Sequence, residues 1–330
     1  MRRFLALPLL ILALTPGTWW HEPQPPRSRS FKLQFFPVPL PPESVRAASL
    51  GRFRLERAWR MTGGHWRFGG FSALVPLGDG ELLAVGDRGY RLRFSPPGAR
   101  RHPPVFGVTV QRLYGGEKMI DSESATFDRA TGQLWIGWED SNSITRHSLA
   151  FRRFRRAVPP QMRDWGGNLG PEAMARLHDG RFVLLREGFS GLIERRNHQA
   201  LLFAGDPTAS KAPPQVFTFS GPRGFSPTDM AQLPDGRVLV LMRRLLWPLP
   251  ARFAGRIAIA DPRAIRAGTP WRAREVARLE SPLPVDNFEG IAIEPRHDGK
   301  VTVWLISDDN RAVSQRSMLW QLTVDPARLP

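Results

Sequence analysis

The feature that most constrains this chain is a short unit that occurs five times. In each unit a polar or acidic residue precedes a few apolar residues, a two-residue turn follows, and a second apolar run completes the pattern. The turns are Asp79-Gly80, Thr131-Gly132, Asp179-Gly180, Asp235-Gly236 and Asp298-Gly299. Apolar runs that flank such a turn predict β-hairpins. Successive turns lie roughly 50 to 60 residues apart, which is typical of blade-type β repeats.

Each repeat expands into about four short strands, which predicts an all-β five-bladed β-propeller. A six-bladed propeller is the alternative if the long fourth repeat hides a degenerate unit, and a two-sheet sandwich is the structural competitor. The fifth repeat ends one strand short. Residues 53–59 alternate in polarity and have no sheet of their own, so we expect them to pair beside residues 319–324. This pairing of N- and C-terminal strands would close the ring and remove its open edges.

The chain divides into three predicted parts. Residues 1–20 begin with Arg2-Arg3 and an apolar run over residues 4–14, which is typical of a secretory signal peptide or an N-terminal membrane anchor. Residues 21–50 are rich in proline and predict an extended linker that excludes helix and central strand. Residues 51–330 form the propeller domain. These features predict a periplasmic or extracellular protein with possible N-terminal membrane attachment.

Composition excludes several classes of site and partner. The chain has no cysteine, so disulfides, thiolate metal sites and cysteine nucleophiles are excluded. The net charge is +17, but the excess is almost entirely arginine scattered over the whole length, so we predict no nucleic-acid partner. The dense run at residues 152–156 is interpreted as a solvated strand edge, with contact to anionic lipid head groups as the alternative. The sequence leaves the oligomeric state open.

Acidic residues recur where the first strand of each repeat begins. In a propeller these strands line the central channel, so equivalent positions converge on the axis; they are Ser72, Glu123, Glu172, Asp229 and Glu289. Four converging carboxylates raise one another's pKa values or require a cation, and oxygen ligands of this kind suit Ca²⁺. Glu123, Glu172, Asp229 and Glu289 are therefore the predicted metal ligands. The alternative is that each acid accepts hydrogen bonds from backbone amides of the adjacent blade.

A second set of polar residues follows the second strand of each repeat. Antiparallel hairpins return to the side where they began, so acids and arginines should share one face with the first set. The set consists of Asp87-Arg88, Glu139-Asp140, Arg186-Glu187, Arg243-Arg244 and Asp308-Asp309-Asn310. Arginines beside a carboxylate-held ion suit a phosphorylated or carboxylated ligand. The competing interpretation is that these residues form salt bridges and Asx turns at loop starts.

These motifs resemble the exported phytase-like family described by the esterase-like activity of phytase. The resemblance rests on four segments: residues 69–74 with 86–89, residues 121–125, residues 170–174, and residues 287–292 with 307–310. It covers about residues 53–324 and implies an exported propeller with a calcium-assisted phosphoesterase or esterase activity. The lysine clusters expected of a true phytase are missing, and Lys118 alone lies near the second repeat. Arg88, Arg186 and Arg243 could replace them, and the missing lysines argue against phytate as the substrate.

The sequence thus supports two functions. The first is an exported metal-assisted hydrolase whose ligand is a small-molecule ester or phosphoester. Asp87 or Asp308 would orient water, and Arg88 or Arg243 would neutralise the leaving or transferred group. The second is a non-enzymatic propeller that binds a protein or a cell-envelope ligand on its loop face.

Overall fold

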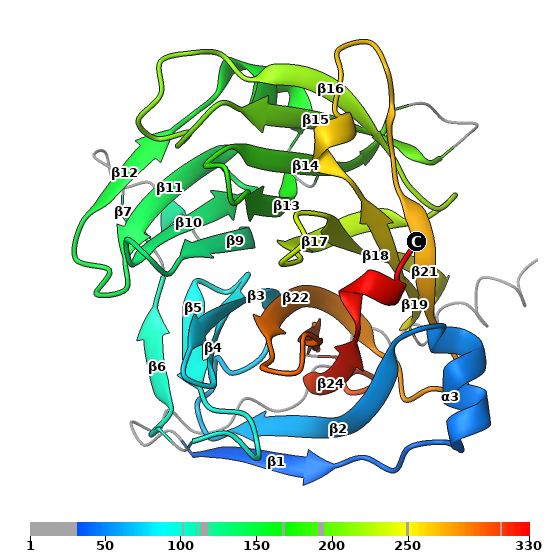
Figure 1. Cartoon of the computed structure of the whole chain (residues 1–330). Coiled ribbons are helices and arrows are strands. Elements are labelled where there is room, and N and C mark those ends of the chain that lie inside the picture. Colours follow the sequence, from blue (N-terminus) through cyan, green and yellow to red (C-terminus); the bar gives the residue numbers. More distant parts are fainter. Residues whose placement is uncertain are drawn as a thin grey trace, which may run out of the picture.

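Five β-sheets surround a central axis in the computed structural model (Figure 1). It describes residues 32–100, 102–109, 111–112, 118–119, 121–166, 169–190, 195–248, 251–310 and 312–330. The predicted signal or anchor at residues 1–20 lies outside the described residues. Among the described residues, no helix has the length and apolar character needed to cross a membrane. The predicted five-bladed propeller is confirmed, and the alternatives of a six-bladed propeller and a two-sheet sandwich are wrong.

The strands of each blade are given from the axis outward. Blade 1 contains β3 (Phe71–Gly78), β4 (Glu81–Gly86), β5 (Tyr90–Phe94) and β6 (Val105–Val108). Blade 2 contains β9 (Ser122–Asp128), β10 (Gln133–Trp138), β11 (Ser143–Ser148) and β12 (Phe154–Ala157). Blade 3 contains β13 (Pro171–Arg176), β14 (Phe182–Phe189), β15 (Asn197–Phe203), β16 (Gln215–Ser220) and β20 (Trp271–Arg272). Within these three sheets, β20 is parallel to its neighbour and the other strands are antiparallel.

The fourth and fifth blades complete the ring. Blade 4 contains β17 (Ser226–Gln232), β18 (Val238–Pro248), β19 (Ala251–Ala260) and β21 (Arg274–Leu279). Blade 5 contains β22 (Asn287–Pro295), β23 (Val301–Asp308), β24 (Met318–Val324), β2 (Arg54–Gly63) and β1 (Leu33–Pro37). Short elements outside the blades are β7 (Gln111–Arg112), β8 (Lys118–Met119) and the 3₁₀ turns η1 (Pro160–Trp165), η2 (Pro262–Ala264) and η3 (Pro326–Arg328).

The predicted closure of the ring is confirmed. Strand β2 pairs antiparallel with β24, so that Ala58 lies opposite Trp320 and Arg54 opposite Thr323. A segment from the beginning of the propeller thereby completes the sheet that the last repeat leaves open. The outer edge of β24 is consequently covered within the same chain.

The expectation of an extended segment is wrong for the end of the proline-rich region. Residues 33–37 form β1, which pairs with β2, and residues 43–50 form the helix α3 (Glu43–Leu50). An edge strand tolerates Pro37 at its end because no neighbour needs its missing N–H, and Pro42 precedes the helix instead of interrupting it. Leu50 is fully buried against the core, which holds α3 on the propeller.

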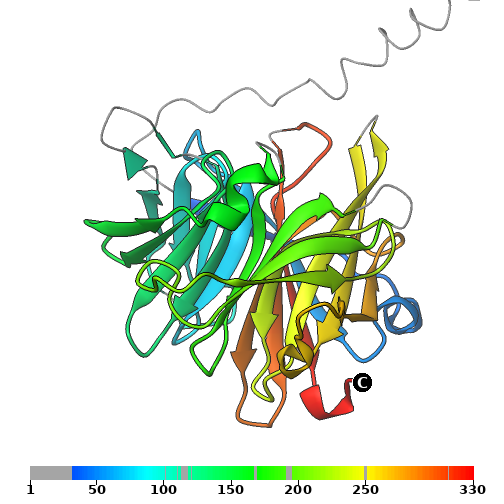
Figure 2. The ribbon, with the colours of Figure 1, turned by 90° about the horizontal axis from the view of Figure 1, so that it is seen from above.

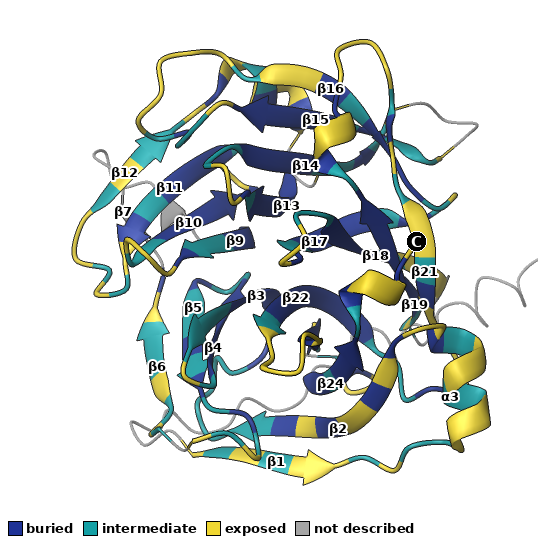
Figure 3. Ribbon diagram, viewed as in Figure 1, coloured by how far each residue is buried: buried dark blue, intermediate teal, exposed yellow. Residues whose placement is uncertain are grey.

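The core consists of apolar clusters between neighbouring blades, and the five inner strands are mostly buried (Figure 3). Four buried tryptophans belong to these clusters. Trp135 packs against blade 3, Trp138 and Trp304 against blade 1, and Trp320 against blade 4. Buried aromatic side chains of this size contribute strongly to inter-blade stability.

Candidate functional site at one end of the axis

Each inner strand contains a β-bulge near its first residues. At the bulge, one residue of the first strand lies opposite no residue of the second strand. These residues are Ser72, Glu123, Glu172, Thr228 and Glu289. A bulge bends the strand and re-aims the extra side chain, and bulges often occur beside active sites. We call the end of the propeller where these residues lie the mouth face, and the end with the inner hairpin turns the far face.

In blade 4 the residue at the bulge is Thr228, not the predicted ligand Asp229. The Asp229 carboxylate accepts backbone N–H bonds from Met230 and Ile291, both at 2.8 Å, and from Leu74 at 3.5 Å. Because Ile291 belongs to blade 5 and Leu74 to blade 1, this buried side chain connects three blades. The structure therefore supports the inter-blade hydrogen-bonding alternative for Asp229, and we leave it out of the candidate ion site.

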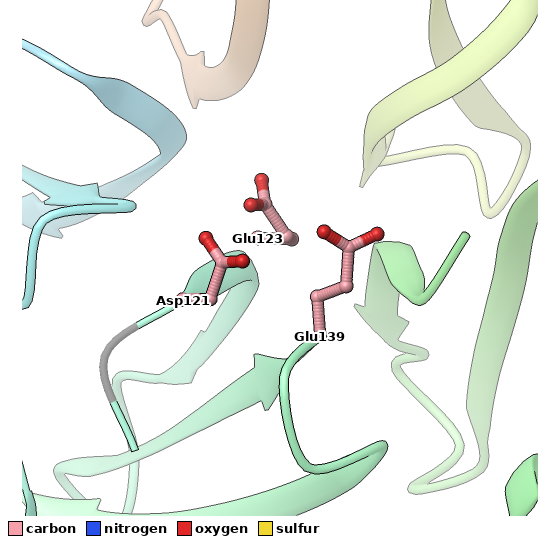
Figure 4. A group of neighbouring side chains, drawn as sticks. All are labelled: Asp121, Glu123 and Glu139. Atoms are coloured by element: carbon pink, nitrogen blue, oxygen red, sulfur yellow. The ribbon is translucent and has the colours of Figure 1, made fainter. Parts of the chain in front are cut away.

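Five carboxylates form two overlapping groups at the mouth face. Asp121, Glu123 and Glu139 offer oxygens that all lie within 4.8 Å of one another, and their side chains point toward a shared space (Figure 4). Glu139, Glu172 and Glu187 form a second group under the same limit. Glu139 belongs to both groups. The carboxylates come from blades 2 and 3, from the start of each first strand and the end of each second strand.

Burial and mutual repulsion perturb these acids. Burial raises the pKa of Glu123 well above its ordinary value, and the charges of Glu172 and Glu289 raise it further. Burial also raises the pKa of Glu172, with Glu187 adding to the effect. For Glu139 burial raises the pKa to about 7, while the hydrogen bond from the Gly170 N–H opposes the shift. Such shifts show a cluster that gains stability from a proton or a cation.

Arg243 supplies positive charge on one side of this cluster. Its Nη1 donates to Asn287 Oδ1 at 3.0 Å and also to Glu289, and its Nη2 lies 3.4 Å from Glu187 Oε1. Burial acts to lower the pKa of Arg243, but the acids, Glu289 first, outweigh burial and raise it. Arg243 is thus held by carboxylates as their counter-ion.

The predicted residues of blades 1 and 5 form a separate cluster at the mouth face, which we call the Arg88 cluster. Arg88 Nη2 lies 2.9 Å from Asp309 Oδ1 and 3.9 Å from Asp308 Oδ1, and its Nε lies 3.7 Å from Asp87 Oδ1. That oxygen of Asp87 is buried without a hydrogen-bond partner. Burial raises the pKa of Asp87 to about 7, against the effect of Arg88, and burial followed by Glu289 raises that of Asp308.

Two glycines before β3 make room for the Arg88 cluster. Gly70 has φ +65°, and a Cβ there would lie 2.1 Å from Asp87 Oδ1. A Cβ at Gly69, which has φ +95°, would lie 2.1 Å from Asp309 Oδ2. Both the positive φ and the close carboxylates therefore require glycine at these positions.

The structure brings together most, but not all, of the predicted site residues. Glu123, Glu172, Glu289, Asp87, Arg88, Asp308 and Arg243 share the mouth face, and Asp229 does not. Sequence reasoning placed Glu139 and Glu187 on this face but did not name them as ion ligands, and it did not single out Asp121. The alternation of Asp121 and Glu123 across one residue was the available signal. Arg186, considered as a phosphate ligand, instead donates to the carbonyls of Trp165 and Leu169.

Fold and site define a class: a five-bladed propeller with a carboxylate-rich axial mouth. The family model described as "Phytase-like: Esterase-like activity of phytase" matches residues 66–311. The chain belongs to this phytase-like family, as the resemblance in the sequence had indicated. No curated protein matches the chain.

Solved structures with a related shape are remote. The chain is similar to a chain of a nidogen/laminin complex with 9% identity and TM-score 0.45, over 91% of this chain and 100% of that chain. It is similar to Myxococcus xanthus glutaminyl cyclase with 12% identity and TM-score 0.45, over 83% and 96%. A hypothetical protein from Leishmania major has 14% identity and TM-score 0.43, over 79% and 86%. These similarities carry no argument about activity.

Proposed function

We propose that this protein is an exported, metal-assisted hydrolase of small phosphate or carboxylate esters that acts at the mouth face. The observation that carries the proposal is the pair of overlapping carboxylate groups centred on Glu139. The esterase-like activity in the family description supports the same class of reaction. Residues 1–20 would direct export to the periplasm or the extracellular space.

The donor set fits a hard divalent cation such as Ca²⁺. All donors of the two groups are carboxylate oxygens, which is the ligand type that Ca²⁺ prefers. The raised pKa values of Glu123 and Glu172 support the fit, because these acids gain from added positive charge. Asp121, Glu123, Glu139, Glu172 and Glu187 would hold the ion. When bound, it would stabilise negative charge that develops on an ester oxygen.

Asp87 is the chain's own candidate for moving a proton. Its pKa of about 7 and its side chain, which is 33% exposed, suit a general base that accepts a proton from water near neutral pH. Arg88 holds this region in place through Asp309 and through a 3.1 Å bond to the Phe68 carbonyl. Asp308 lies beside Arg88 and would help to orient the same water. Arg243, facing the carboxylates, would balance their charge as the ester is cleaved.

The test combines binding and turnover on the full chain. After chelation, Ca²⁺ should raise the melting temperature, and the protein should hydrolyse nitrophenyl phosphate or nitrophenyl acetate. Glu172→Gln should abolish most of the calcium-dependent shift. Asp179→Asn is the matched control, because Asp179 lies on the hairpin turn at the other end of the same blade and pairs with Arg181. No turnover across a broad ester panel, together with no calcium shift, would remove the proposal and favour a non-enzymatic binding propeller.

A further inference from the structure

Strand directions decide which loops share the mouth face. First strands run away from it and second strands return, so the segments after β4, β10, β14, β18 and β23 lie there. Outermost strands β6 and β12 also end at this face, because Val108 pairs with Tyr90 and Ala157 with Ile144. The C-terminus lies at the opposite end (Figure 2).

Exposed apolar side chains gather on these mouth-face segments. In the part of the chain that the structure describes, six large apolar residues with exposures of 40–52% lie at this end: Val108, Val158, Leu169, Leu245, Leu246 and Val313. Val105 and Val216 are at the far ends of their strands. Six of the nine exposed large apolar side chains among the described residues thus lie at one end of the molecule, and this asymmetry favours an interaction surface there.

The ends of β18 and β19 form a ribbon that projects beyond its blade. The first residue of β17 pairs with Arg243, and the last residue of β21 pairs with Gly255. Arg244 and Leu245 pair only with Ala254 and Phe253 across the ribbon, and Figure 2 shows the ribbon rising past its neighbours. Leu245 and Leu246 are half exposed on it. A two-stranded ribbon with exposed leucine side chains is poorly stabilised in water and suits an apolar environment.

The exposed charge around the mouth is mainly positive, in contrast to its centre. Exposed arginines on these segments include Arg163, Arg195, Arg223, Arg244 and Arg252. Exposed acids on the same segments include Asp140 and Asp164. At this centre Glu139, Glu172 and Glu289 are buried, and Asp121, Glu123 and Glu187 are half-buried. Arginines beside exposed leucines are typical of surfaces that bind anionic lipid.

The N-terminal segment joins the propeller at the same face. Leu33, the first residue of β1, pairs with Gly63, the last residue of β2. Arg60 of β2 pairs with Met318, where β24 begins at the mouth end. The described part of the chain therefore begins at the mouth face, and the sequence that precedes it contains Arg2-Arg3 and the apolar run at residues 4–14.

From these four observations we propose that the mouth face docks on a lipid bilayer that carries anionic head groups. Leu245 and Leu246 enter the head-group region, and the surrounding arginines contact lipid phosphates. The axial mouth then opens toward the bilayer. This inference does not rest on the proposed hydrolase activity, since docking and turnover are measured separately.

The absence of cysteine allows a site-specific test on the full chain. Each of two variants carries one cysteine, to which an environment-sensitive fluorophore is attached. Leu246→Cys places the fluorophore on the mouth face, and Val216→Cys places it at the far end of β16. Vesicles contain phosphatidylcholine alone or with phosphatidylglycerol, with and without spin-labelled lipid. With anionic vesicles we expect a blue shift and quenching for the label at 246, and no change for the label at 216. The N-terminal segment can hold the chain on vesicles by itself, so the labels, and not the bound fraction, decide the orientation.

Two results would overturn the proposal: a label at 246 that stays in water on bound protein, or quenching at 216 instead. The first would leave the face free for a protein partner. A second variant pair checks the energetics. Leu245→Asp with Leu246→Asp should reduce affinity for anionic vesicles about tenfold or more, because two half-exposed leucines no longer gain by burial. Val216→Asp should leave the affinity unchanged.

Discussion

Replacing Asp229 by asparagine should destabilise the propeller and leave its calcium affinity unchanged. The carboxylate accepts with both oxygens: Oδ1 takes the Met230 N–H, and Oδ2 takes those of Ile291 and Leu74. An asparagine side chain has the same shape but only one acceptor oxygen. Whichever way it is turned, its NH₂ group faces at least one buried backbone donor.

The magnitude follows from the number of stranded donors. A buried donor left without an acceptor costs about 1–3 kcal/mol. One well-formed bond is always lost, the 3.5 Å bond to Leu74 is a weaker contribution, and the facing donors repel. We therefore expect about 2–4 kcal/mol of destabilisation by the same reasoning. For a domain of this size the melting temperature should fall by roughly 5–10 °C.

The assay is thermal unfolding followed by circular dichroism, with calcium titration of the folded protein. Asp235→Asn is the control, because Asp235 lies on the turn of the same blade and pairs with Arg237 near the surface. That change should cost less than about 1 kcal/mol, as surface ion pairs do. A variant Asp229→Asn that melts like the parent but binds calcium more weakly would refute our argument and restore Asp229 as a ligand.

Three further predictions concern other parts of the molecule. Burial, and to a lesser extent Arg91, lowers the pKa of His147 to about 4, whereas the unfolded chain should titrate near 6.5. The unfolded state thus binds more protons between these values, so stability falls as the pH decreases through this window. His147→Leu should flatten that dependence, checked by denaturant midpoints at pH 4.5 and 7, and an unchanged slope relative to the parent would contradict it. Gly70→Ala should reduce turnover far more than Gly132→Ala: both have φ +65°, but a Cβ at Gly132 meets no atom within 4 Å and one at Gly70 meets Asp87. Equal activity of the two variants would count against a role for Asp87. Arg243→Gln removes a counter-ion from the carboxylates and should lower the stability of the calcium-free protein by about 3–5 kcal/mol. Added calcium should restore much of the lost melting temperature. An equal loss of melting temperature with and without calcium would argue against a shared acidic site.

The fold was predictable because its signals are local. Asp-Gly and Thr-Gly turns mark each inner hairpin, and the positive φ of Gly80, Gly132, Gly180, Gly236 and Gly299 is the conformation that such turns require. The closure could also be inferred, since a final repeat with an open edge and an early strand without a sheet need each other. The hairpins could be inferred from residues within a few positions of one another, and the closure from the number of strands in the first and last repeats.

The elements missed by the sequence depend on tertiary contacts. Strand β1 gains its place by pairing with β2, and α3 by burying Leu50 against blades 4 and 5. The many prolines of this region argued against both elements. However, Pro37 lies at the end of the edge strand β1, and Pro42 precedes α3. Similarly, β20 joins blade 3 although it follows three strands of blade 4 in the sequence. Its short length gives no periodic signal.

The one-residue error at Asp229 explains the charge pattern of the site. Counted back from the turn, Ser72 precedes Asp79, Glu172 precedes Asp179, and Thr228 precedes Asp235 by the same seven positions, whereas Asp229 is six away. In an alternating strand one position decides whether a side chain faces the mouth or the neighbouring blade. Blade 4 therefore contributes a hydroxyl at its bulge and, from β18, the cation Arg243. Because Arg243 faces Glu289 and Glu187, the remaining carboxylates of the two groups, Asp121, Glu123, Glu139 and Glu172, are left with the least compensated charge. A divalent ion should accordingly bind off the axis, beside Glu139, and not at the centre of a symmetric acidic ring.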